Sequence, residues 1–203
     1  AAAPALADVV PFLVVLSPIF AITAIIFMVS IRYSTKLANS LSVNPILLPF
    51  IGATACGLVG LFVPQALGLG VSNINDMISG EYLVPLLISV LIAKIFMTAA
   101  CIGFGIFGGV FSPALFIGVA AGALATKLLV SLGFNDVASV VTVAAMAAVS
   151  ASVIGAPLSA VLIVLELSQS YEYAVAAMIA VMVCSLITHR LFGHSFFDRQ
   201  LLD

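Results

Sequence analysis

Charged side chains are scarce in this sequence of 203 residues. It contains six Lys and Arg and eight Asp and Glu, 7% of the chain, whereas soluble domains carry about 25%. Hydrophobic residues make up 64%, and the mean hydropathy is +1.37. This apolar surface exceeds what one soluble core can bury, so the composition excludes a soluble globular fold and predicts a membrane protein in contact with lipid.

The sequence also lacks the patterns of several function classes. The formal net charge is −2 and no basic run occurs, which leaves nothing to neutralise a phosphate backbone and excludes nucleic acid as a partner. No GxSxG, HExxH, Walker or Rossmann pattern is present, so we predict neither an enzyme nor a cofactor. The three cysteines, Cys56, Cys101 and Cys184, are odd in number and form no CxxC pair. They are predicted to be small packed residues rather than metal or redox groups.

Long apolar runs dominate the chain. The first is free of charge and long enough to cross a ~30 Å hydrocarbon layer at ~1.5 Å per residue. Two other runs, 137–152 and 157–167, are too short to span a bilayer alone. The pattern predicts an all-α, polytopic membrane protein with tilted and broken helices. The expected spans are 9–31, 45–63, 83–101, 114–130 and 173–191.

Two polar stretches separate the first three runs. Residues 32–36 hold two of the six basic residues, and are predicted to form a cytoplasmic loop by the positive-inside tendency. Residues 64–82 contain three glycines and only two charges, and are predicted to form a structured loop or a broken, shallow helix.

Some ionisable residues lie inside or beside apolar runs. Lys94 is in the middle of one run, where lipid would penalise its charge, so we expect it to face inward and pair with a carbonyl or a carboxylate. Glu166 is assigned a structural hydrogen-bonding role rather than proton transport. His189 and His194 have no neighbouring ligand cluster and are expected to anchor the chain at the membrane interface, with no metal site.

A dense glycine cluster, 103–113, interrupts the apolar runs. Four glycines in seven residues disfavour a regular helix. Ser112 suits an N-cap and Pro113 the first helical position, so a helix is expected to begin near residue 112.

Within a membrane, the free amides at that helix start would have no water to bind, and an anion would satisfy them. The candidate amides are those of Gly109, Val110 and Phe111, which glycine leaves open to a ligand. Equally, the glycines could serve only close helix packing, as the GxxxG pair Gly118 and Gly122 does.

Several motifs resemble one family. The segment IGFGIFGGVFSPALFIGVAAG (102–122) resembles the GxFxP region of CLC chloride channels and proton/chloride antiporters. GAPLSAVLIVLELSQSYEY (155–173), GLGVSNIND (68–76) and HSFFDRQLLD (194–203) match other family motifs in order. The resemblance therefore covers nearly the whole chain.

The resemblance implies that residues 1–203 form one domain, the C-terminal half and second inverted repeat of a CLC protein. Family members bind the central chloride through GxFxP amides, which map onto Val110 and Phe111. They also use a Ser hydroxyl and a gating Glu from the first half, whose motifs these residues lack. A Tyr at the start of the last helix contributes too. The aligned residue here is Phe197, which has no hydroxyl to donate, so we expect a weaker or differently hydrated site.

The implied function is chloride transport by a homodimer in a bilayer, specifically the bacterial plasma membrane. In the family, the dimer face uses segments that correspond to 9–31, 157–167 and 173–191. Two alternatives remain open: a non-conducting half that needs the missing repeat, and an inverted-repeat transporter of another small anion. The sequence does not separate channel from antiporter.

Overall fold

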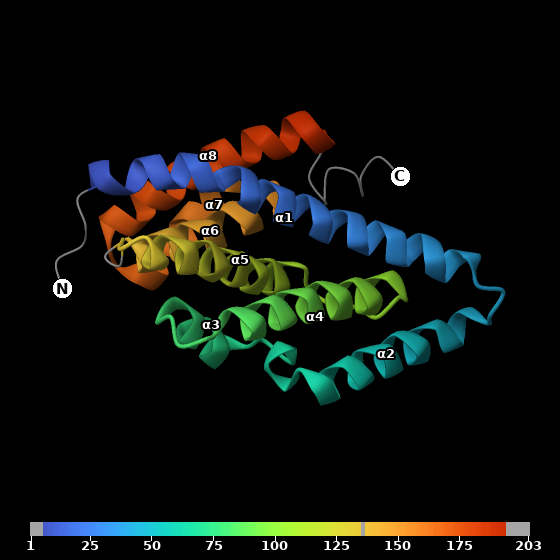
Figure 1. Ribbon diagram of the computed structural model, residues 1–203. Helices are drawn as coiled ribbons and strands as arrows, with labels where there is room; N and C mark the ends of the chain where they lie inside the picture. Colours follow the sequence, from blue (N-terminus) through green and yellow to red (C-terminus); the bar gives the residue numbers. More distant parts are fainter. Residues whose placement is uncertain (1–5, 135–136, 194–203) are drawn as a thin grey trace.

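The structure is a computed structural model that describes residues 6–134 and 137–193. This part of the chain is entirely helical, with short connections and no strand (Figure 1). The α-helices are α1 (Leu6–Ser40), α2 (Leu48–Phe62), α3 (Val71–Ile78), α4 (Val84–Gly103), α5 (Phe111–Ser131), α6 (Ala138–Ile154), α7 (Pro157–Ser168) and α8 (Tyr171–Phe192), and two 3₁₀ turns, η1 (Pro45–Leu47) and η2 (Pro64–Ala66), flank α2.

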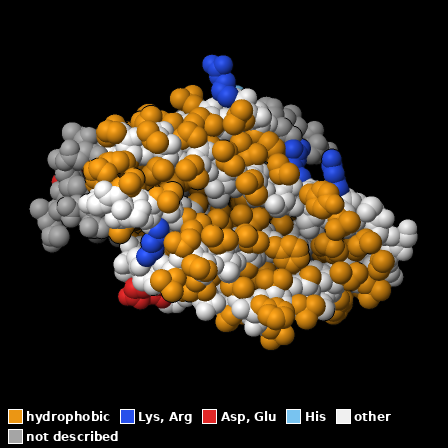
Figure 2. Space-filling view, viewed as in Figure 1, with side chains coloured by type: hydrophobic (Ala, Val, Ile, Leu, Met, Phe, Trp, Pro, Cys, Tyr) orange, Lys and Arg blue, Asp and Glu red, His pale blue; other side chains and the backbone are white. Residues whose placement is uncertain are grey.

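The lengths of these helices agree with the predicted membrane spans. Five segments are long and apolar enough to cross a bilayer: α1, η1 with α2, α4, α5 and α8. The helices α6 and α7 are shorter, as predicted, and are separated by Gly155, which adopts a left-handed φ of 80° and ends α6. Figure 2 shows hydrophobic side chains over most of the visible face, with the few charged ones toward its margin. The protein is thus an all-helical, multi-pass membrane protein.

The helix α6 lies at the centre of the fold. Every side chain from Val140 to Val153 is buried, because α5, α8, α1 and α7 all pack around this helix. Its closest neighbour is α5, across the Gly118 and Gly122 face. A Cβ added at Gly118 would lie 2.8 Å from the Cα of Met146, and one at Gly122 would lie 2.9 Å from the Cα of Thr142. The predicted GxxxG packing face is therefore confirmed.

The predicted loop at residues 32–36 is wrong, because α1 continues through them to Ser40. No Pro or Gly interrupts the chain there, and charge alone does not end a helix. Thr35 Oγ1 donates to the carbonyl of Ile31 at 3.0 Å, and Ser34 is buried where an added Cβ at Gly103 would collide with it. At ~1.5 Å per residue α1 is roughly 50 Å long, so it must tilt or extend beyond the hydrocarbon layer.

The segment 64–82 is a broken helix, as predicted. Gly70, with φ 66°, precedes α3, and Asn73 Nδ2 donates to the carbonyl of Gln65 at 2.7 Å. Tyr82 Oη donates to Asn73 Oδ1 at 2.9 Å. Burial, together with the nearby Asp76 and Glu81, raises the pKa of Tyr82 above its usual value, which keeps the phenol protonated as a donor.

Lys94 holds this segment to α4. Its side chain is only 5% exposed, and Nζ donates to the carbonyls of Ala66 at 2.9 Å and Gly68 at 2.6 Å. The ring of Phe116 lies beneath, 4.7 Å from Nζ to the ring centroid. The predicted inward orientation and carbonyl pairing of Lys94 are confirmed.

Replacing Lys94 with methionine is expected to lower the free energy of unfolding by about 2 kcal/mol, because two carbonyls lose a charged donor while the stem still fills its space. Thermal unfolding of the purified protein in detergent measures this change. The matched control is Lys36→Met near the end of α1, where the side chain is exposed. If both variants unfold at the wild-type temperature, the Lys94 contacts do not stabilise the fold.

Candidate anion-binding site

The site is built on the connection between α4 and α5. After α4, the amide of Phe104 donates to the carbonyl of Ala100 at 3.0 Å, and that of Gly105 to Ile102 at 3.1 Å. The amide of Ile106 returns to the carbonyl of Cys101 at 2.9 Å, a closure that requires the left-handed φ of 84° at Gly105. This glycine turn ends α4 and starts a segment with no regular hydrogen bonding.

The amides from residue 107 to residue 112 have no hydrogen-bond partner among the described residues. The next backbone amide that donates is Ala114, to the carbonyl of Val110 at 3.0 Å, because Pro113 has no N–H. Free amides concentrated at a helix start carry partial positive charge, which a 21-residue helix adds to through its dipole. This arrangement attracts an anion without using a charged side chain.

The helix begins close to the predicted position, near residue 112, but with a different N-cap. Its first residue is Phe111 and its N-cap is Val110, with φ −82° and ψ −22°, so Ser112 and Pro113 are the second and third helical residues. The prediction of Ser112 as N-cap was wrong, since the N-cap is Val110 and Ser112 already lies inside the helix. The shift leaves the amides of Val110 and Phe111 directly at the helix start.

The segment is anchored on one side and open on the other. The side chain of Val110 is buried and belongs to the core cluster that α1, α4, α5, α6 and α8 form, which fixes the backbone. Gly108 and Gly109 are exposed, and nothing lies within 4 Å of a Cβ added at either. Phe111 is 39% exposed. The backbone of Gly109 can thus be approached closely by a ligand or by another part of the protein.

The position of this segment along the molecule fits a site inside the membrane. In Figure 1, α5 starts near the middle of the long dimension of the molecule, well short of the α1–α2 connection. A helix start at that depth would otherwise leave its amides without water.

The remaining predicted residues stand apart from this segment. Phe197 and His194 lie outside the described residues. Glu166 is exposed on α7, and its carboxylate makes no hydrogen bond within the described ranges. The nearby Gln169 Nε2 donates instead to the backbone carbonyl of Glu166 at 2.7 Å. The Glu166 side chain therefore has no hydrogen-bond partner among the described residues, and its structural role stays a prediction.

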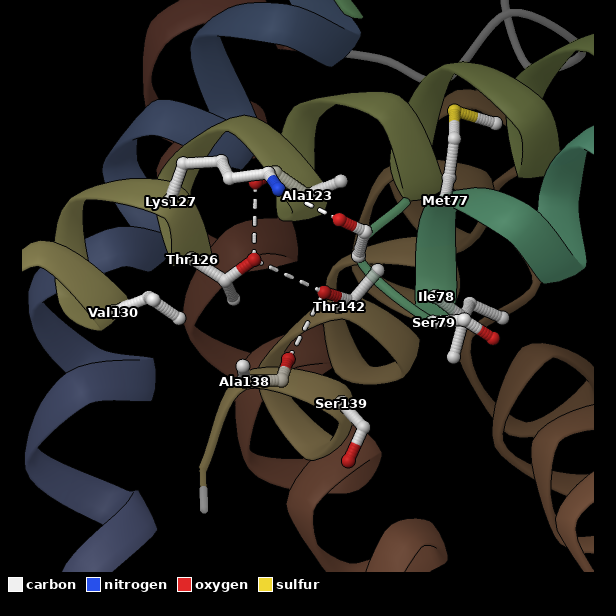
Figure 3. Close-up of a pocket in the computed structure, with 11 residues that line it drawn as sticks. Met77, Ile78, Ser79, Ala123, Thr126, Lys127, Val130, Ala138, Ser139 and Thr142 are labelled. Atoms are coloured by element: carbon white, nitrogen blue, oxygen red, sulfur yellow. Dashed lines mark hydrogen bonds between the residues drawn. The ribbon is translucent and has the colours of Figure 1, made fainter. Parts of the chain in front are cut away.

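A polar pocket at the other end of α5 was not predicted. It has a volume of about 420 Å³ and lies between α3, α5 and α6 (Figure 3). Lys127 Nζ donates to the carbonyl of Gly80 at 2.7 Å, and Thr126 and Thr142 donate to the carbonyls of Ala123 and Ala138 at 3.0 and 2.9 Å. The two threonine hydroxyl donors are thus already used within the protein, unlike the amides at the start of α5.

The chain is similar to known proteins over most of its length. The family model described as voltage gated chloride channel matches residues 2–189. The H(+)/Cl(−) exchange transporter ClcA of Vibrio campbellii is 33% identical over 150 residues, covering 72% of this chain and 31% of the relative. The voltage-gated ClC-type chloride channel ClcB of Escherichia coli is 30% identical over 153 residues, covering 74% of this chain and 36% of the relative.

A solved structure shares the fold. The crystal structure of a slow cyanobacterial Cl−/H+ antiporter matches with a TM-score of 0.84 at 22% identity, over 99% of this chain and 48% of that one. The chain therefore spans about a third of the length of these curated relatives and about half of the solved chain.

Proposed function

The chain belongs to the voltage gated chloride channel family, and from this we propose that it forms part of a transmembrane chloride pathway. Chloride is bound by the backbone amides of Gly109, Val110 and Phe111 at the start of α5. The observation that carries the proposal is that the amides from residue 107 to residue 112 have no partner within residues 6–134 and 137–193. An uncharged site of this kind holds an anion loosely enough to release it, as conduction requires.

The proposal extends to the domain that surrounds the site. Residues 1–203 are the second of two inverted repeats, and the other repeat covers the open side of Gly108 and Gly109. Phe197, in the place of the family's Tyr, offers no hydroxyl to the ion, so the amides carry a larger share of binding. The relatives are a bacterial exchange transporter, ClcA, and a bacterial chloride channel, ClcB, and we place this protein in a bacterial plasma membrane.

We further propose that the protein is a homodimer. The segments expected at the dimer face are on α1, α7 and α8, and α8 packs against both of the others. Large apolar side chains on α7 and α8 are exposed there, among them Leu158, Leu162, Met182 and Leu186. Cross-linking of the full-length protein in membranes tests the stoichiometry.

Chloride efflux from liposomes tests the function. The full-length protein that carries these residues is expected to release chloride, as recorded with a chloride electrode, while a pH electrode shows whether protons move in the opposite direction. Absence of anion flux at every pH and voltage would contradict the proposal. Flux of small carboxylates that chloride does not inhibit would favour a different anion. Residues 1–203 reconstituted alone are expected to conduct nothing, because half of the pathway is missing.

A further inference from the structure

Two cysteines that are far apart in the sequence touch in the fold. The Sγ atoms of Cys56 on α2 and Cys101 on α4 are 3.0 Å apart, although 45 residues separate them. Cys56 Sγ also lies 3.2 Å from the carbonyl oxygen of Met97. The third cysteine, Cys184 on α8, instead accepts a hydrogen bond from Ser152 Oγ at 3.1 Å. All three cysteines are free; Cys56 and Cys184 are buried, as predicted for small packed residues, and Cys101 is half-buried.

The packing of α2 on α4 holds the pair together. Among the longer helices, α2 packs chiefly on α4. One turn before Cys56, a Cβ added at Gly52 would lie 3.2 Å from the carbonyl oxygen of Ala100, the residue before Cys101. This close approach of the two backbones lets the two sulfur atoms come to 3.0 Å, about 1 Å more than the length of an S–S bond.

The surroundings favour a dithiol over a metal site. Among the described residues no group of three or more His, Cys, Asp and Glu side chains could hold a metal ion. Cys101 is half-buried and Cys56 is 8% exposed, so a small neutral oxidant meets Cys101 first. A resolving thiol next to a more accessible one is the usual arrangement of a redox-sensitive pair.

We propose that Cys56 and Cys101 are a modification site at which a hydroperoxide forms a reversible disulfide between α2 and α4. With hydrogen peroxide, the sulfur of Cys101 attacks one peroxide oxygen, the O–O bond breaks, and the products are a sulfenic acid and water. The sulfur of Cys56 then attacks the Cys101 sulfur, the S–O bond breaks and a second water leaves. Two thiols are oxidised and one peroxide is reduced to two waters. A dithiol reductant reverses the reaction by exchange.

The position of Cys101 links the disulfide to the α4–α5 connection. Its carbonyl accepts the hydrogen bond from Ile106 that closes the glycine turn, and the unpartnered amides follow directly. The disulfide therefore ties α2 to this turn and limits its movement. The consequence for transport rests on the proposed function, but formation of the bond does not.

Peptide mapping tests the site directly. The full-length protein in native membranes is treated with hydrogen peroxide, free thiols are blocked under denaturing conditions, and the digest is analysed by mass spectrometry. We expect one peptide pair joined through Cys56 and Cys101, two hydrogens lighter than the separate peptides, that dithiothreitol releases. The Cys184→Ser control keeps this cross-link, whereas Cys56→Ser and Cys101→Ser lose it. Wild-type protein whose two thiols both remain fully open to alkylation, or oxidise without joining, overturns the proposal.

Chloride efflux measurements test whether the Cys56–Cys101 disulfide, once formed, changes transport. Peroxide is expected to slow flux through wild-type protein, dithiothreitol to restore it, and neither to affect flux through Cys56→Ser. A mapped cross-link with unchanged flux overturns the coupling to transport and leaves the modification site standing. A protein with no flux before oxidation contradicts the proposed function instead.

Discussion

Leucine in place of Gly109 is expected to reduce chloride flux to the level of liposomes without protein, while the protein still folds. The added side chain would stand directly in front of the amides of Val110 and Phe111 and exclude the ion. Residues 1–203 themselves accommodate the change, because none of their described atoms lies within 4 Å of a Cβ at this position and the backbone has no left-handed φ. Efflux from liposomes and elution of the purified protein on size exclusion measure the two properties separately.

The matched control for this variant is Gly57→Leu. Gly57 is exposed on α2, with nothing within 4 Å of an added Cβ, so the same substitution there adds apolar surface away from the α4–α5 connection. Flux through this control should equal that of the wild type. Correctly folded Gly109→Leu protein that transports chloride at the wild-type rate would mean that these amides do not bind the ion.

Valine in place of Gly118 is expected to destabilise the protein by about 3 kcal/mol or more, at the upper end of the cost of overpacking a core. The added Cβ would lie 2.8 Å from the Cα of Met146 and 2.9 Å from the carbonyl oxygen of Ala145. Both atoms belong to the backbone of α6, so no side-chain rotation relieves the overlap and the two helices must separate. Thermal unfolding in detergent, with the fraction of monodisperse protein, measures the loss.

Two further variants show how the loss of stability depends on the size and the place of the added side chain. Gly118→Ala adds only the Cβ and should cost less than valine, whereas Gly57→Val, on the exposed face of α2, should leave the unfolding temperature close to that of the wild type. Equal stability of Gly118→Val and Gly57→Val would contradict the close α5–α6 packing.

The sequence predicted the helices well because the bilayer imposes a simple rule on composition. Apolar runs such as 83–101 and 173–191 correspond to α4 and α8, and the short runs correspond to α6 and α7.

The loop prediction at 32–36 failed because charged residues show where a chain leaves the lipid, not where its helix ends. In α1, which continues through this stretch, Thr35 Oγ1 donates a hydrogen bond to the carbonyl of Ile31. The N-cap prediction at Ser112 failed because the buried Val110 side chain, rather than a capping hydroxyl, fixes the start of α5.

By itself, the sequence determined that the protein is helical and built for lipid, and that Lys94 must face inward, because lipid admits neither unsatisfied backbone nor free charge. It also predicted an anion site at the glycine cluster, with close helix packing as the alternative. Only the tertiary structure decided which carbonyls receive Lys94 and which amides remain unpartnered. It alone brought Cys56 to Cys101, since these contacts join segments that are distant along the chain and depend on how α2, α4 and α5 pack.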